Sequence, residues 1–336
     1  MQVKSSVCFV ITVALFLVAT SVGLAQVEDL SSERPPGESP TRVEVAFYLI
    51  DLMRVIDRDG TFEADVFVIA NWKDPRLSGE RVRVVPATEV WTPNVAVFNE
   101  RAVSSRLPEV VEIQPDGTVV SRQRLIGTFS SALDLGGFPL DRQTLELRLV
   151  VYGNNVDEVL LVESSTMPSG RSPELAVTDW EIGELETNAA AFSPIPGFEL
   201  SSLTLRLPAR RLVGYYAVQI LVPLILIVSM SWIPFWIGSN TINVRVGVCV
   251  TTVLTLIAYR FMIGGLVPKL PYLTRIDHLL LGSTILVASA LVCAVGGAFL
   301  MTRDRAASVR RLDAVARVAF PVGFVLLLGW VMLVGS

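Results

Sequence analysis

The second half of the chain contains four apolar segments that are each long enough to cross a membrane. They lie at approximately residues 213–237, 244–267, 279–301 and 315–334. A helix that spans the hydrocarbon core of a bilayer needs about 20 mostly apolar residues. Since only helices and closed barrels satisfy their backbone polar groups inside lipid, we predict a transmembrane domain of four helices over residues 212–336.

The preceding half of the chain has the opposite character. There are 16 basic and 29 acidic residues between Val27 and Ala209, but 11 basic and 3 acidic residues from Arg210 to the end. This asymmetry indicates two domains in two different solvents. Five arginines and two aspartates lie around the junction of the third and fourth apolar segments, and the positive-inside rule places that junction in the cytoplasm. We therefore expect a multi-pass protein of the inner (plasma) membrane, with both ends of the mature chain outside, in the periplasm.

The first residues have the layout of a secretory signal. Lys4 precedes the apolar run 7–22, which is followed by the small residues 23–25. This order predicts a signal peptide over residues 1–25. An uncleaved membrane anchor is the alternative, and either would export the acidic half. We expect residues 26–40 to form a flexible N-terminus.

Apolar and polar residues alternate repeatedly in the exported half. The clearest runs are residues 43–47, 63–68, 144–149 and 201–207, and a period of two is typical of half-buried strands. Turn signals such as Arg-Asp-Gly and Pro-Asp-Gly separate these runs. We predict an all-β, immunoglobulin-like sandwich over residues 41–211, followed by the four-helix transmembrane bundle, in an α+β multidomain membrane protein.

Cysteine and histidine are scarce. Cys8, Cys249 and Cys293 all lie in apolar segments, and His278 is the single histidine. The exported half therefore has no disulfide framework or thiolate metal site, and a histidine-rich catalytic centre is excluded. We expect no enzyme activity, no metal, no cofactor and no nucleic-acid partner, although hydrolysis by a pair of carboxylates remains formally open.

Three motifs occur in a characteristic order before the apolar segments: WKDPRL at 72–77, WTPN at 91–94 and FPLDRQ at 138–143. This order resembles the pentameric ligand-gated ion channels, the superfamily of Cys-loop receptors, over nearly the whole mature chain. The cysteine pair of the animal receptors would fall on Ser131 and Leu145 here, so the chain lacks it, as is usual in prokaryotic members. The resemblance implies a homopentamer in the lipid bilayer that binds a small-molecule agonist and passes monovalent ions.

The resemblance makes the second apolar segment the pore helix. Positions three or four apart share a helix face. Along one such face the side chains are small or carry a hydroxyl at the start of the helix and are bulkier further along. Rings of apolar side chains repeated by five subunits would close such a pore by dewetting. The alternative is that the small residues only allow close helix packing. The predicted pore-lining residues are Asn243, Gly247, Thr251, Leu254, Ala258 and Phe261.

Ion selectivity depends on charge near this helix. No acidic residue lies between Ser239 and Arg275, whereas cation-selective members usually carry an acidic ring, so we expect an anion-selective or weakly selective channel. The proline typical of anion-selective filters is missing, and the acidic exported domain would attract cations. A cation-selective channel is therefore one alternative. A nonconducting solute receptor is another. We expect Arg245 to face the cytosol and Arg260 to point away from the pore.

The resemblance also places the agonist pocket between subunits, with aromatic residues from both sides. Aromatic faces attract organic cations, so an amine agonist is favoured. Protons are the alternative agonist, although Leu256 stands where one proton-gated type has a membrane histidine. The expected ligand-binding residues are Phe98, Tyr152 and either Phe192 or Phe198 on one side, and Phe67 on the other.

Gating requires contacts between the sandwich and the membrane helices. The resemblance implies four contributors: the turn 57–59, the loop 138–141, Arg211 and the loop 268–272. Arg211 paired with Asp141 or Asp57 would form a charge-assisted contact at a partly dry junction. The expected coupling residues are Asp57, Asp59, Phe138, Pro139, Asp141, Arg211, Pro268 and Pro271.

Overall fold

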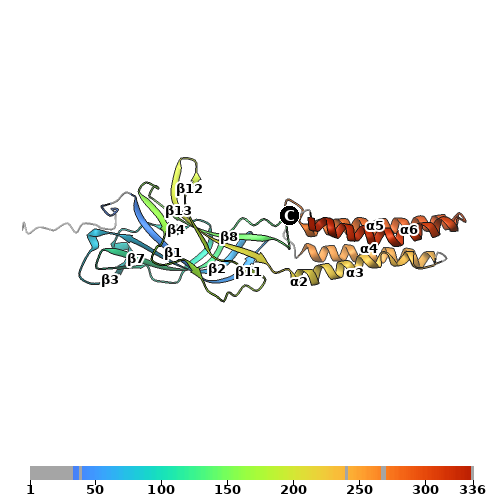
Figure 1. The fold of residues 1–336 in the computed structure, drawn as a ribbon, viewed down its shortest axis with the longest axis horizontal. Helices are drawn as coiled ribbons and strands as arrows, with labels where there is room; N and C mark the ends of the chain where they lie inside the picture. Colours follow the sequence, from blue (N-terminus) through green and yellow to red (C-terminus); the bar gives the residue numbers. More distant parts are fainter. Residues whose placement is uncertain (1–32, 38–39, 239–240, 266–269, 334–336) are drawn as a thin grey trace, which may run out of the picture.

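The computed structural model describes residues 33–37, 40–238, 241–265 and 270–333. The predicted signal peptide, over residues 1–25, lies outside this part of the chain, as do residues 26–32 and 38–39 of the predicted flexible N-terminus. The molecule is elongated, with a β-sandwich at one end and a bundle of helices at the other (Figure 1).

The first sheet of the sandwich has eight strands, with the order β10-β1-β2-β7-β6-β3; β9 also pairs with β1, and β5 with β7. Its long central strands are antiparallel, and β1 pairs with β2 over nearly its whole length. The strands are β1 (Thr41–Ile56), β2 (Thr61–Lys73), β3 (Arg83–Pro86), β5 (Glu100–Ser105), β6 (Val110–Ile113), β7 (Thr118–Ser130), β9 (Val159–Glu163) and β10 (Gly170–Arg171).

The second sheet has five strands, with the order β11-β13-β8-β4, and β12 also pairs with β13. The hairpin of β12 and β13 stands away from the body of the sandwich (Figure 1). Its turn contains Gly197, whose φ of +87° favours glycine. The strands are β4 (Val95–Val97), β8 (Arg142–Val151), β11 (Trp180–Ile182), β12 (Glu186–Ile195) and β13 (Phe198–Arg211).

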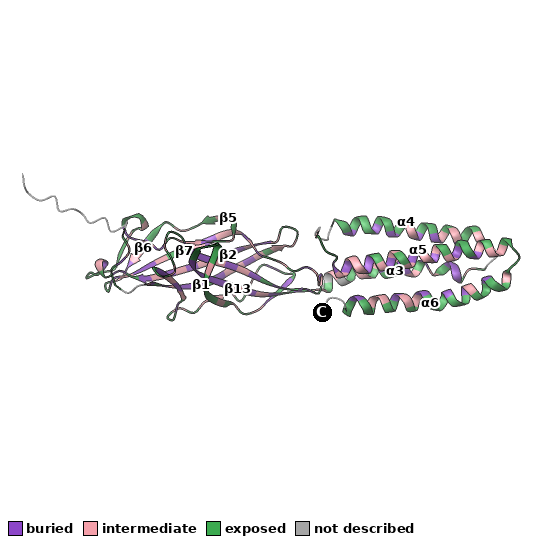
Figure 2. Cartoon of the chain, turned by 90° about the horizontal axis from the view of Figure 1, so that it is seen from above, coloured by how far each residue is buried: buried purple, intermediate pink, exposed green. Residues whose placement is uncertain are grey.

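Alternation in the sequence determines which side chains fill the sandwich core. Leu145, Leu147 and Leu149 of β8 are each at most 1% exposed, and they lie opposite alternate leucines of β13. The intervening residues of both strands are polar and face outward, as a half-buried sheet requires. Buried residues colour the interior of the sandwich in Figure 2.

Two of the three sequence motifs support the core. The rings of Trp72 and Trp91 meet edge to face at 6.3 Å. Asp74 is fully buried, caps a short 3-10 helix, η1 (Pro75–Leu77), and binds the guanidinium of Arg76. A second short 3-10 helix is η2 (Ala87–Glu89).

Four helical segments in the described residues are long and apolar enough to cross a membrane. The first, Val218–Phe235, comprises most of a π-helical turn η3, α3 and the 3-10 turn η4, and the short helix α2 precedes it; the other three are single helices. Their bounds are α2 (Gly214–Tyr216), η3 (Ala217–Leu221), α3 (Val222–Met230), η4 (Ile233–Phe235), α4 (Ile242–Gly264), α5 (Arg275–Thr302) and α6 (Ala306–Leu333). The predicted fold class, a β-sandwich followed by a four-helix transmembrane bundle, is confirmed.

Three of these helices begin before the apolar segments identified in the sequence: α4 by two residues, α5 by four and α6 by nine. A capping box between Thr274 and Asp277 starts α5, because it satisfies backbone amides that the first turn leaves unpaired. The arginine-rich stretch before residue 315 belongs to α6. In Figure 2, α4 and α6 form opposite flanks of the bundle, with α3 and α5 between them.

Candidate functional site

Two of the predicted ligand-binding residues are in contact on the second sheet. Phe98 follows β4, and its amide donates to the carbonyl oxygen of Arg148 on β8 at 2.8 Å. The ring of Phe98 meets that of Phe192 on β12 edge to face, with 4.7 Å between the centroids. We call Phe98 and Phe192 the aromatic pair. Tyr152, after β8, and Phe198, at the start of β13, are 45% and 60% exposed, and no ring contact joins them to the pair within the described residues.

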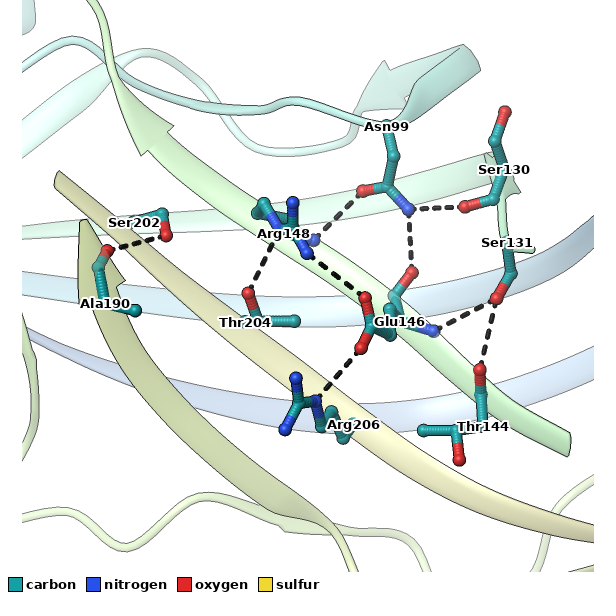
Figure 3. A network of polar contacts seen from close by, with 10 residues as sticks. All are labelled: Asn99, Ser130, Ser131, Thr144, Glu146, Arg148, Ala190, Ser202, Thr204 and Arg206. Carbon is teal, nitrogen blue, oxygen red and sulfur yellow. Dashed lines mark hydrogen bonds and ion pairs between the residues drawn. The ribbon is translucent and has the colours of Figure 1, made fainter. Parts of the chain in front are cut away.

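A polar network holds the aromatic pair in place (Figure 3). The side-chain amide of Asn99 donates to the carbonyl oxygens of Ser130 at 2.6 Å and Glu146 at 2.7 Å, and its oxygen accepts from the amide of Arg148 at 2.9 Å. Asn99 therefore ties the segment after β4 to β7 and β8. The only sequence signal for this role is its position next to Phe98.

The side chains of β8 and β13 extend this network on the outer face of the second sheet. Arg148 donates to the hydroxyl of Thr204 and to Glu146, both at 3.2 Å, and Arg206 donates to the same carboxylate at 3.0 Å. The Arg148 guanidinium also lies over the ring of Phe192, 4.5 Å from its centroid. One carboxylate therefore serves two guanidinium groups beside the aromatic pair.

Phe67, the remaining predicted ligand-binding residue, lies on the first sheet. On β2 it is directly opposite Tyr48 of β1 and Arg124 of β7. An apolar cavity of about 330 Å³ opens here, lined by Tyr48, Phe67 and Met167 among others. The structure thus puts Phe67 on a different sheet from the aromatic pair. Tyr48 is an aromatic neighbour that sequence reasoning missed, because strand register, rather than spacing along the chain, brings it beside Phe67.

Arg211, at the end of β13, occupies the junction between the sandwich and the helices. It is 2% exposed. Its guanidinium binds Asp141 at 2.8 and 3.2 Å and Asp57 at 2.7 and 2.9 Å, and it lies 4.1 Å from the ring centroid of Trp180. Burial lowers the pKa of Arg211, but hydrogen bonds to Asp141 and Asp57 outweigh this effect and raise the pKa above its ordinary value. Both expected partners bind at once, whereas Asp59 is not among the ion-pair partners of Arg211.

Two hydrogen bonds connect the same region to the start of α5 and the residues just before it. The amide of Leu135 donates to the hydroxyl of Tyr272 at 3.2 Å, and the amide of Arg275 donates to the carbonyl oxygen of Gly136 at 3.3 Å. The loop before β8 is thereby attached to the loop between α4 and α5.

Phe138 joins the sandwich to the first transmembrane segment. Its ring is 1% exposed and meets Tyr216 of α2 edge to face, with centroids 5.3 Å apart. Pro139 follows it through a cis peptide bond and lines a small apolar cavity with Tyr216. Pro271 directly precedes Tyr272 at the junction, while Pro268 lies outside the described residues.

The helix α4 has one buried and one exposed face within the subunit. The buried face packs against α3 and α5 and includes Cys249, Thr252 and Leu256. The hydroxyl of exposed Thr251 makes no hydrogen bond within the described part of the chain. All the predicted pore-lining residues are on the exposed face: Asn243, Gly247, Thr251, Leu254, Ala258 and Phe261.

The two arginines of α4 lie off this stripe. Arg245 is 3% exposed, donates to the carbonyl oxygen of Pro234 at 2.8 Å and forms an ion pair with Asp313 of α6. The expectation that Arg245 faces the cytosol is therefore wrong, because Asp313 and Pro234 provide a polar site inside the bundle. Arg260 is exposed and contacts the hydroxyl of Thr284 at 3.5 Å.

A β-sandwich joined through a buried ion-pair cluster to four membrane-length helices is the architecture of a receptor-channel subunit. Residues 28–190 match the family described as neurotransmitter-gated ion-channel ligand binding domain, and residues 220–317 match the neurotransmitter-gated ion-channel transmembrane region. The chain belongs to the pentameric ligand-gated ion channels. It is a multi-pass membrane protein with an extracellular N-terminal domain.

Two relatives illustrate the range of the family. The chain is 28% identical to a proton-gated ion channel of Gloeobacter violaceus, over 89% of this chain and 85% of the relative. It is 27% identical to the gamma-aminobutyric acid receptor subunit beta-4 of Gallus gallus, over 76% of this chain. That alignment spans 54% of the receptor subunit, about half its length.

Proposed function

We propose that five copies of this chain form a homopentameric channel for monovalent ions. A small organic agonist binds between neighbouring sandwiches, α4 of each subunit lines the pore, and the Arg211 junction transmits agonist binding to the helices. Binding favours an open state that already exists in equilibrium with the closed one. Among the described residues, the coupling surface of this proposal consists of Asp57, Asp59, Phe138, Pro139, Asp141, Arg211 and Pro271.

The exposure pattern of α4 carries this proposal. The uncharged stripe of predicted pore-lining residues on α4 is exposed within a single subunit, whereas the opposite face of the helix is buried. A hydroxyl without a partner is unfavourable toward lipid but well solvated in a water-filled pore, which supports a pore-lining position for Thr251. Leu254 and Phe261, 61% and 81% exposed in the subunit, would then form the apolar constrictions.

The separation of the aromatic residues supports an agonist pocket shared by two subunits. The aromatic pair belongs to the second sheet and Phe67 to the first. A pocket that contains both the aromatic pair and Phe67 therefore needs two copies of the chain. An amine on the agonist would be attracted to the aromatic faces. Tyr152 and Phe198, exposed at the ends of their strands, complete the pocket in this proposal. Gating by protons is the alternative.

We propose that the pore is anion-selective or weakly selective. Asp313 balances the charge of Arg245, and no acidic residue lies between Ser239 and Arg275, so neutral hydroxyl and amide groups face the ions. The acidic exported domain opposes this preference, because it concentrates cations at the outer mouth.

Cysteine accessibility tests the pore assignment with two adjacent threonines. Thr251 is on the exposed stripe and Thr252 is 1% exposed. In a background with Cys249 and Cys293 replaced by serine, a charged thiol reagent should block current in Thr251→Cys and leave Thr252→Cys unaffected. Equal block of both variants, or of neither, would contradict the pore assignment.

The reversal potential tests selectivity. Purified protein in a planar bilayer is exposed to a KCl gradient while pH is stepped and primary amines are perfused. Reversal near the chloride potential supports the proposal, and reversal near the potassium potential would assign selectivity to the acidic domain. Absence of current under every condition would favour a nonconducting solute receptor.

A further inference from the structure

Two polar side chains are exposed near the outer ends of the membrane-spanning helices. Arg260 of α4 and Gln219 of the π-helical turn η3 are both exposed in the subunit. Within the described residues, the side chain of Gln219 makes no hydrogen bond, and Arg260 makes only a long contact from Nη1 to the hydroxyl of Thr284 at 3.5 Å. An unpaired polar group in hydrocarbon is costly. Both side chains therefore need partners that the described part of one subunit does not supply.

The two side chains lie at the same depth in the membrane. The hydroxyl of Tyr259, the residue before Arg260, donates to the carbonyl oxygen of Ile220, the residue after Gln219, at 2.5 Å. Arg260 is four residues before the end of α4, and Gln219 is five residues after the start of α2. With a rise of about 1.5 Å per residue, each is about 6–8 Å from the outer end of its helix. The two residues can therefore meet without a shift of either helix along the membrane normal.

The two side chains belong to different sides of the subunit. Arg260 contacts Thr284, so it lies on the side of α4 that faces α5. Tyr259, one residue earlier and about 100° away around the helix, contacts the first transmembrane segment, which carries Gln219. In the proposed pentamer α4 faces the pore, and a closed ring of identical subunits brings unlike sides of neighbours together. The α5 side of one subunit then meets the first transmembrane segment of the next.

The sequence leaves Arg260 little choice of partner at that interface. No acidic residue lies between Arg211 and Arg275, so the first two membrane segments of a neighbour offer no carboxylate. Asp277, at the start of α5, is engaged in the capping box. Gln219 is the single side-chain amide between Arg211 and Gly238. Its oxygen is the acceptor that the first transmembrane segment can present to a guanidinium.

We infer that Arg260 of each subunit binds the side-chain amide of Gln219 of the partner subunit. The inference rests on the proposed function, because it requires a ring of subunits with α4 at its centre. The guanidinium donates to Oε1 of the amide in a charge-assisted hydrogen bond. The contact recurs at each interface of the ring and removes both polar side chains from lipid. Polar contacts of this kind hold membrane helices together where the surrounding side chains are apolar.

Charge variants at position 219 test the contact in the purified full-length pentamer. Gln219→Glu should raise the midpoint temperature of pentamer dissociation, because a carboxylate forms an ion pair with Arg260, and Gln219→Lys should lower it by repulsion. Both shifts, measured relative to Gln219 in the same background, should disappear in Arg260→Gln. The control background is Arg310→Gln, which removes an exposed arginine at the inner end of α6. Both shifts should persist there.

Thiol cross-linking tests whether the contact joins two subunits. Gln219→Cys and Arg260→Cys are combined in the background with Cys249 and Cys293 replaced by serine. A short bifunctional thiol reagent should produce a ladder from dimer to pentamer on a denaturing gel. Each single variant is a matched control and should stay at the monomer position, because identical positions of neighbouring subunits do not meet in this arrangement.

The outcomes separate this inference from the proposed function. Shifts at position 219 that persist in Arg260→Gln would overturn the inference and leave the channel assignment intact, as would a double variant that stays at the monomer position although the untreated protein is a pentamer. The first result would mean that Arg260 extends to the lipid headgroups instead. Untreated protein that is not a pentamer would overturn both proposals. A silent pentamer that shows the ladder and the Arg260-dependent shifts would support this contact and contradict the proposed channel.

Discussion

Replacing Arg211 by glutamine is expected to break the connection between the sandwich and the membrane helices. The arginine makes four contacts of 2.7–3.2 Å with Asp57 and Asp141, and its removal leaves two carboxylates facing each other at a buried junction. Loss of one member of a buried ion pair costs about 3–5 kcal/mol, or a factor of roughly 10² to 10³ or more in an equilibrium constant. A cost of this size approaches the about 5.5 kcal/mol that shifts a two-state equilibrium from 1:99 to 99:1.

Two measurements on the same preparations separate folding from gating. Thermal stability of the detergent-purified pentamer reports on the junction. Current at matched surface expression, with pH steps and primary amines as stimuli, reports on coupling. The control is Arg210→Gln, because the Arg210 side chain is 64% exposed and pairs with Glu181 at 3.7 Å. Exposed pairs of this kind contribute about 0–1 kcal/mol, so the control should behave as the wild type.

A triple variant distinguishes the uncompensated charges from the lost connection. Combining Arg211→Gln with Asp57→Asn and Asp141→Asn removes both leftover charges, so thermal stability should recover in large part. Current should not recover, because the three neutral side chains cannot hold the turn after β1 and the loop before β8 to the end of β13 as the guanidinium does. Wild-type current in Arg211→Gln, or recovered current in the triple variant, would refute this role for Arg211.

Three further changes have defined outcomes. Leu254→Ser should cause current without agonist, because a hydroxyl ring no longer dewets the constriction; a silent resting state would contradict this position for Leu254. Asp313→Asn should lower the pentamer yield, because it leaves Arg245 buried without its ion-pair partner. Adding Arg245→Gln should restore part of the yield, and a yield that stays low would show that the unpaired charge is not the cause. Asp116→Asn should lower thermal stability at neutral pH. Hydrogen bonds from Lys73 and the backbone amide of Thr118 lower the pKa of Asp116 from 3.8 to about 2. The difference in thermal stability between variant and wild type should therefore disappear as the pH falls through this interval. A difference that does not change with pH would exclude the ion pair as its cause.

The sandwich was predictable because alternation reports directly on burial. Leu145, Leu147 and Leu149 alternate with polar residues along β8, and the structure buries all three. The four transmembrane helices were predictable for a similar reason, since length and apolarity decide whether a segment spans a bilayer. The starts of α5 and α6 were not, because a capping box and a charged helical turn leave no mark on hydropathy.

The site was less predictable because its contacts join distant parts of the chain. The sequence pattern predicts a position facing the cytosol for Arg245 of α4 and could not identify Asp313, 68 residues further on, as its buried partner. Similarly, the spacing of aromatic residues along the chain does not contain the register between strands that brings Tyr48 opposite Phe67. Nor does it contain the side-chain packing that brings Arg148 over Phe192. Sequence patterns indicate which face a residue occupies, and tertiary packing decides what it meets there.

The buried ion pairs at the two ends of the helices constrain how this channel can open. Arg211 at the outer end and Arg245 at the inner end are each almost fully buried and paired. Breaking either pair would cost about 3–5 kcal/mol, whereas about 5.5 kcal/mol is enough to shift a two-state equilibrium from 1:99 to 99:1. Agonist binding that also had to break a pair in every subunit would lose most of its effect. We therefore expect Arg211, Asp57 and Asp141 to move as one rigid unit, so that the loops around them carry the motion to the start of α5 and to α2 with their hydrogen bonds intact.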